Sequence, residues 1–106
     1  MFYDRRGKAI SAEEFARLFE DANYRRVGHT EVGGFVVSTI WLGIDHAFSF
    51  IAAGDVPHAP VLFETMTFPV NDDPDVGCTR YATLAQATEG HDRIVQALKR
   101  RVELHR

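Results

Sequence analysis

The stretch "RVGHTEVGGFVVSTIW", residues 26–41, sets the architecture of this chain. Two runs of strand-forming residues flank Gly33-Gly34, and a Gly-Gly pair supplies the positive φ angles that a two-residue hairpin turn requires. The pattern therefore predicts an antiparallel β-hairpin. Its expected pairs, outward from the turn, are Val32 with Phe35, Thr30 with Val37 and Val27 with Ile40.

This register assigns side chains to the two faces of the hairpin, because successive residues of a strand point to opposite sides. One face is expected to carry Val32, Thr30, Phe35, Val37, Thr39 and Trp41. The other is expected to carry Val27, His29, Glu31, Val36, Ser38, Ile40 and Leu42. Both faces are partly apolar. We therefore expect helices on one side and either a partial cover or a second subunit on the other.

Helices are predicted before and after the strands. Ser11 and Glu14 fit a capping box, and apolar residues follow at helical spacing to about residue 22. Thr83 and Gln86 form a second capping box, ahead of a helix that would reach Leu104 and be about 30 Å long. A glycine inside a helix is unfavourable, so Gly90 indicates a close approach of the helix to another part of the chain.

Further strands are predicted at residues 61–70, "VLFETMTFPV", and at residues 78–82, "CTRYA", with a shorter one at residues 48–52, "FSFIA". The order is helix, strands, helix. It predicts a two-layer α+β fold, in which a three- to four-stranded antiparallel meander is flanked by an N-terminal helix and a long C-terminal helix. A length of 106 residues predicts one domain, residues 1–106.

Composition excludes several classes of protein. The formal net charge of −3 argues against a general nucleic-acid binder. No run of about 18 apolar residues exists, and "MFYDRRGK" at residues 1–8 lacks the apolar segment of a signal peptide, so we expect a cytoplasmic protein that does not enter a membrane. A single cysteine, Cys78, excludes an internal disulfide framework and a cysteine-based zinc site. We expect no cofactor.

Four polar residues stand out from the pattern and are the candidate site: Asp45, His46, Glu64 and His91. Asp45 and His46 follow the second hairpin strand, and His91 lies on the apolar stripe of the last helix. Glu64 shares a strand face with Leu62, Met66 and Phe68. If that helix crosses the sheet, the four could hold a divalent metal or act as an acid–base pair. Equally, Glu64 could pair with Arg80 or with His91 as a buried structural contact, and Asp45 could accept turn N–H groups.

Phe48, Phe50 and Ile51 form the candidate partner-binding patch. They follow the Asp45-His46 pair in a segment rich in glycine and proline. In a domain this small these side chains could fold back onto the core. If they are exposed, they form a cluster of large apolar side chains that is typical of a protein-binding surface.

Four motifs together, "VSTIWLGIDHAF", "PVLFETMTF", "RYAT" and "EGHDRIV", resemble a family of small uncharacterised proteins encoded by actinobacteria and their bacteriophages. The resemblance runs from about Val37 to Val95, and the family pattern includes all four candidate-site residues. Family members have a shorter turn where this chain has "SFIAAGDVPHA", residues 49–59. The longer, more apolar segment implies a contact surface particular to this member.

The leading functional hypothesis is a non-enzymatic interaction protein that binds a protein partner. One concrete version is an anti-CRISPR-like inhibitor of a host defence complex. The alternative is a small metal-dependent or acid–base enzyme that uses the candidate site. A third hypothesis is a structural homodimer assembled through sheet edges.

Overall fold

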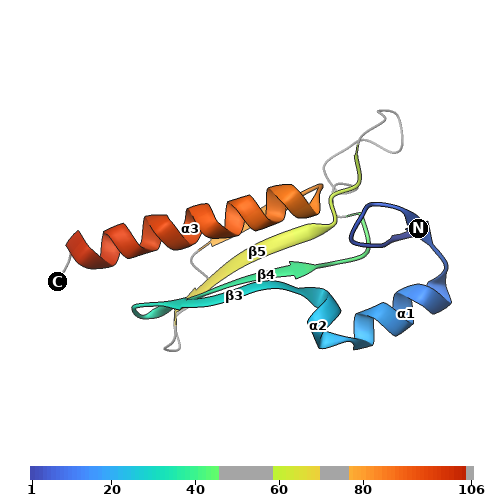
Figure 1. Ribbon diagram of the computed structural model, residues 1–106, viewed down its shortest axis with the longest axis horizontal. Coiled ribbons are helices and arrows are strands. Elements are labelled where there is room, and N and C mark those ends of the chain that lie inside the picture. Colours follow the sequence, from blue (N-terminus) through green and yellow to red (C-terminus); the bar gives the residue numbers. More distant parts are fainter. Residues whose placement is uncertain (46–58, 70–76, 105–106) are drawn as a thin grey trace.

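Four strands form an antiparallel meander in the computed structural model, which describes residues 1–45, 59–69 and 77–104 (Figure 1). The sheet order is β3-β4-β5-β6, the chain order. The strands are β3 (Arg26–Val32), β4 (Phe35–Trp41), β5 (Phe63–Pro69) and β6 (Gly77–Tyr81). The predicted α+β fold with a meander is confirmed. The strand predicted at residues 48–52 and the patch of Phe48, Phe50 and Ile51 lie outside the described residues.

The hairpin register is confirmed near the turn and wrong at its far end. Val32 pairs with Phe35, and Gly33 adopts a φ of 57°. Ile40, however, pairs with Arg26, because the register shifts by a β-bulge between Arg26 and Gly28. The extra residue turns Val27 to the side of Trp41, where it packs against the core. Val27 therefore does not lie on the face that carries His29 and Glu31.

The described helices begin where the capping boxes predict. Ser11 Oγ accepts a hydrogen bond from the Glu14 N–H at 3.1 Å and caps α1 (Ala12–Glu20). Asp21 then caps a further short helix, α2 (Ala22–Arg25), which is why α1 stops before the predicted end. Thr83 Oγ1 accepts from the Gln86 N–H at 3.1 Å, and Gln86 Oε1 accepts from the Thr83 N–H at 3.2 Å. This reciprocal pair starts α3 (Leu84–Leu104).

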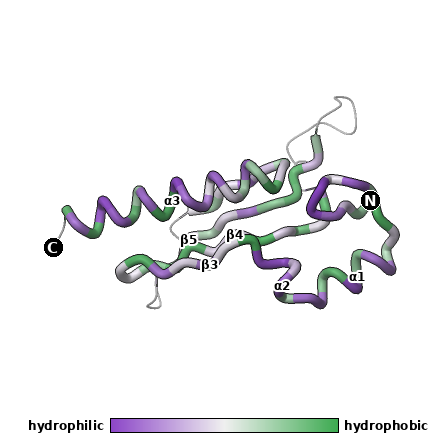
Figure 2. Tube along the Cα trace, in the orientation of Figure 1, coloured by the Kyte–Doolittle hydropathy of each residue, from purple (hydrophilic) through white to green (hydrophobic). Residues whose placement is uncertain are grey.

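All three described helices lie on the same face of the sheet. α3 runs over β3, β4, β5 and β6, while α1 and α2 pack at the end of the sheet beside Trp41 (Figure 1). Hydrophilic and hydrophobic residues alternate along α3 in turns, as expected of a helix with one face on a core (Figure 2). Leu18, Trp41 and Phe63 belong to one buried cluster, and Val37, Val95 and Leu98 to a second nearer the hairpin turn.

A small hairpin of β1 (Phe2–Tyr3) and β2 (Ala9–Ile10) closes the Trp41 end of the molecule. The Tyr3 N–H donates to the Gly43 carbonyl at 2.9 Å, and Trp41 Nε1 donates to the Tyr3 carbonyl at 3.1 Å. These bonds fix the hairpin to the segment that leaves β4. No helix in the described part of the chain is long and apolar enough to span a membrane.

Candidate functional site

His91 lies between α3 and the sheet, with both ring nitrogens beside threonine hydroxyls. Nδ1 is 2.7 Å from Thr39 Oγ1, and Nε2 is 2.9 Å from Thr30 Oγ1. Thr39 Oγ1 is also hydrogen-bonded to Thr65 Oγ1. The hydrogen bonds thus form one continuous chain through Thr30, His91, Thr39 and Thr65. We call it the His–Thr chain. It joins three strands of the sheet to one side chain of α3.

Two glycines leave the space that this packing needs. A Cβ atom at Gly28 would lie 2.8 Å from His91 Cε1, inside the contact distance of carbon atoms. A Cβ atom at Gly90 would overlap the ring of Tyr81. Gly90 therefore marks a close approach of helix to sheet, as the sequence predicts.

Most of the His–Thr chain is closed to solvent, while Thr30 at one end of it is half-buried. Thr39 is 0% exposed, Thr65 is 1% exposed and His91 is 5% exposed. Burial lowers the pKa of the imidazole from its ordinary value, and the nearby His29 lowers it further, while Asp92 acts in the opposite direction. A neutral imidazole has one donor and one acceptor, and a hydroxyl can serve either, so the neutral form is fully hydrogen-bonded. A substrate cannot reach the hydroxyls of Thr39 and Thr65. The arrangement suits a structural contact that fixes α3 on the sheet.

Glu64 lies on the opposite side of the sheet from His91. It is the neighbour of Thr65 in β5, and successive side chains of a strand point to opposite faces. Its Oε2 accepts a hydrogen bond from Arg80 Nε at 3.0 Å, across the register pair of β5 and β6. This ion pair raises the pKa of Arg80 above its ordinary value, chiefly through the hydrogen bond. The structure therefore shows the Glu64–Arg80 contact and does not bring Glu64 to His91.

Asp45 makes a structural contact that is separate from those of His91 and Glu64. Its Oδ1 accepts a hydrogen bond from the backbone N–H of Val61 at 2.8 Å. This bond joins the chain segment after β4 to the segment before β5. His46 lies outside the described residues. Within residues 1–45, 59–69 and 77–104, no three His, Cys, Asp or Glu side chains group closely enough to hold a metal ion.

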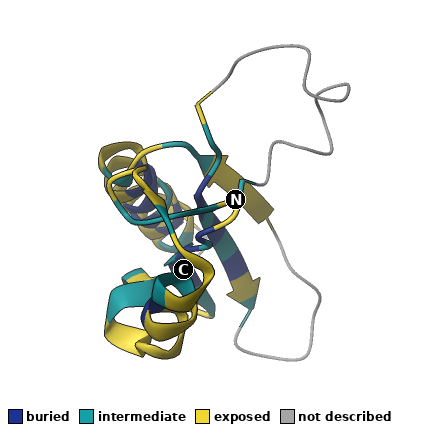
Figure 3. Cartoon of the chain, turned by 90° about the vertical axis from the view of Figure 1, so that its right-hand side faces the viewer, coloured by how far each residue is buried: buried dark blue, intermediate teal, exposed yellow. Residues whose placement is uncertain are grey.

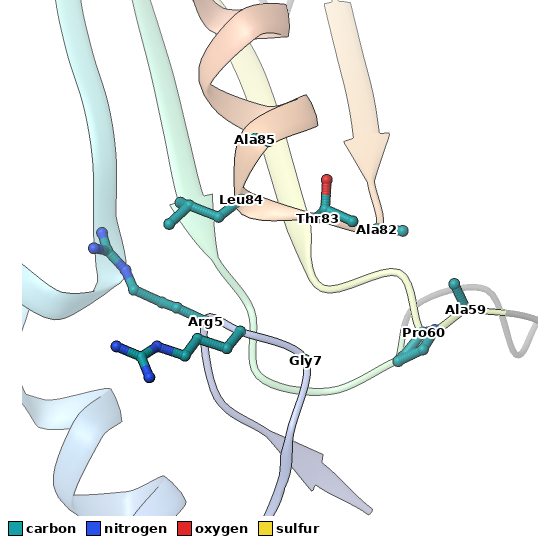
Figure 4. Close-up of a pocket in the computed structure, with 9 residues that line it drawn as sticks. Arg5, Gly7, Ala59, Pro60, Ala82, Thr83, Leu84 and Ala85 are labelled. Atoms are coloured by element: carbon teal, nitrogen blue, oxygen red, sulfur yellow. The ribbon is translucent and has the colours of Figure 1, made fainter.

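Two hollows of the described surface lie at the Trp41 end of the molecule. One has a volume of about 400 Å³ and opens between the β1–β2 turn, Pro60 and the first turn of α3 (Figure 4). Its walls are mostly small or apolar: Gly7, Ala59, Pro60, Ala82, Leu84 and Ala85. The Arg5 guanidinium points away from Thr83, and its Nη2 donates to the Arg26 carbonyl at 2.8 Å.

A second cleft of about 420 Å³ is lined by Met1, Tyr3, Ile44 and Asp45. Met1 is 83% exposed and Ile44 is 42% exposed. The two clefts border the points where the chain enters and leaves residues 46–58, which contain the candidate partner-binding patch. We call this end of the molecule, which the β1–β2 hairpin closes, the hairpin end. It comprises Met1, Tyr3, Ile44 and the walls of the first cleft.

Sequence reasoning missed three members of the His–Thr chain and the glycine beside it. The hairpin register predicts Thr30 and Thr39 on the face that the helices cover, and a polar residue on a core face needs a partner. His91 is the polar residue on the facing stripe of α3. The combination of the two patterns would have predicted their contact.

Comparison with protein-family models, with curated proteins and with solved structures gives no match to this chain.

Proposed function

We propose that the chain is a non-enzymatic protein-binding module that contacts its partner through the hairpin end. The observation that carries this proposal is the exposure of Met1 and Ile44 beside two open, largely apolar clefts. Large apolar side chains that remain accessible beside a hollow are typical anchors of protein interfaces. Phe48, Phe50 and Ile51, the candidate partner-binding patch, begin four residues after Ile44 in the sequence.

The separation of the candidate-site residues favours binding over catalysis. Acid–base catalysis requires the acid and base to reach a common reacting atom. Glu64, Asp45 and His91 each serve a different contact, and the sheet lies between Glu64 and His91. The partner class that fits the resemblance to phage-encoded proteins is a host protein complex. Inhibition of a defence complex is the concrete version of this proposal.

The proposal is tested by affinity capture from host lysate with matched variants. We expect the wild-type protein to retain a specific partner, and Ile44→Ser and the double variant Phe48→Ser/Phe50→Ser each to weaken binding about 10-fold, because truncating a buried anchor costs about 1–2 kcal/mol. Leu104→Ser is the control, because Leu104 is 82% exposed at the far end of α3.

Thermal unfolding of each variant checks that the fold is kept. Equal capture by the wild type and by both hairpin-end variants would contradict the proposal, as would the absence of any specific partner.

A further inference from the structure

The face of the sheet opposite the helices has an unusual residue pattern. In β5 the side chains that point toward the helices include Thr65 and Thr67, whereas Met66 and Phe68 point away from them. A strand with one face in water normally shows the reverse, with apolar side chains toward the core. Phe68 is 38% exposed. Phe63 is buried on the helix side, yet two large apolar side chains of β5 remain on the other face, as is typical of a face that binds a partner.

The same face continues across β4. Val36 and Ile40 lie on it, on either side of Ser38, and both are half-buried. None of the described helices packs on this side (Figure 3). The apolar centre of the face therefore consists of Val36, Ile40, Met66 and Phe68. We call this centre, together with the charged residues around it, the open face.

The strand register arranges the open face in three rows across the sheet. The row nearest the hairpin turn contains Glu31, Val36 and Phe68. The middle row contains His29, Ser38, Met66 and Cys78. The row nearest the hairpin end contains Arg26, Ile40, Glu64 and Arg80.

The charges of the outer rows are opposite. Glu31 makes the first row negative, whereas Arg26 makes the third row positive, since Glu64 and Arg80 are paired with each other. A two-fold axis along the middle row would stack the first row of one copy on the third row of another. It would place Glu31 over Arg26 twice, and Val36 over Ile40. An axis parallel to the strands would instead bring Arg26 over the Glu64–Arg80 pair and would separate Glu31 from Arg26, so the charges of the two copies would not complement each other.

We propose that the open face binds a second copy of this chain, face to face, about a two-fold axis that runs along the middle row. The interface is isologous, with an apolar centre and complementary charges at its ends. It lies on a different surface from the hairpin end, so it does not depend on the proposed function. Three strands of seven residues and one of five cover roughly 400 Å² of footprint, which belongs to the smaller specific interfaces. We therefore expect dissociation in the micromolar range.

Light scattering over a concentration series tests the dimer. The mass is expected to rise toward twice the 12.0 kDa of one chain. Met66→Glu places two carboxylates opposite each other on the axis and should weaken dimerisation by about 100-fold. Ser38→Arg repeats the test at a half-buried polar position of the same row. Ala97→Glu, on the exposed side of α3, should have no effect.

Crosslinking through Cys78 tests the orientation. Cys78 is exposed and is the single cysteine of the chain. It lies in the middle row, so the two copies of its thiol should meet across the axis, and a short bis-maleimide should yield a covalent dimer that Met66→Glu suppresses. A strictly monomeric protein, or a dimer that survives both Met66→Glu and Ser38→Arg, would overturn the proposal. A dimer without crosslinking would overturn the proposed axis.

The proposal of partner binding and the proposal of a dimer can each be contradicted without the other. Ile44→Ser should lose partner capture and keep the dimer, whereas Met66→Glu should lose the dimer and keep partner capture. A variant that loses both properties while folded would contradict the assignment of two surfaces.

Discussion

The hydroxyl of Thr39 is the residue-scale centre of the His–Thr chain, since it contacts both His91 and Thr65. Thr39→Val keeps the shape of the side chain and removes its hydrogen-bonding capacity. The buried ring nitrogen and the Thr65 hydroxyl would then lack a partner, so we expect a loss of about 1–3 kcal/mol in the free energy of unfolding. Urea denaturation measures it. Thr79→Val, at an exposed position of β6, is the matched control and should change stability little.

Gly28 makes a second residue-scale prediction. Gly28→Ala places a methyl group against the imidazole, and overpacking of this kind costs about 1–3 kcal/mol. Gly34→Ala is the control, because no atom lies within 4 Å of a Cβ at that position. In a His91→Ala background the Gly28→Ala penalty should largely disappear. A penalty of the same size in both backgrounds would show that the ring is not what Gly28 accommodates.

At the scale of elements, the sequence predicts the features that depend on residues close together in the chain. The Gly33-Gly34 turn and the two capping boxes are short-range patterns, and each appears where expected. The bulge in β3 does not follow from its own residues. It lies beside the imidazole of His91, which is distant in sequence, so a register counted outward from the turn has no means of detecting it.

The placement of Glu64 could not be predicted because β5 contradicts the usual rule. Its apolar residues Met66 and Phe68 suggest that their face is the core, and Glu64 shares that face. The true core face carries Thr65 and Thr67, which are buried because Thr65 joins the His–Thr chain and α3 covers this side. The pattern that misplaces Glu64 is also the one that indicates a partner for the open face.

At the scale of the whole molecule, the residues with reactive side chains make structural contacts that hold neighbouring parts of the fold together. His91 fixes α3 to three strands, and Asp45 and Glu64 each connect neighbouring segments. The accessible features are surfaces: the hairpin end and the open face. This division is the basis of the proposal that the chain acts by binding.

The pH dependence of global stability tests that division through His91. Its pKa in the folded protein lies below the ordinary value of 6.5, so the unfolded chain binds protons more readily than the folded one. The contribution of His91 to stability is therefore complete above pH 6.5 and is lost as the pH falls from there through the lower, folded-state pKa.

The most direct measurement is the unfolding free energy of the wild type and of His91→Gln, determined by urea denaturation across this pH range. The difference between the two isolates His91 from the other four histidines of the chain. We predict that the wild type loses its stability advantage over His91→Gln as the pH falls below 6.5. A difference that stays constant with pH, or that grows in acid, would contradict a buried neutral His91 that holds α3 on the sheet.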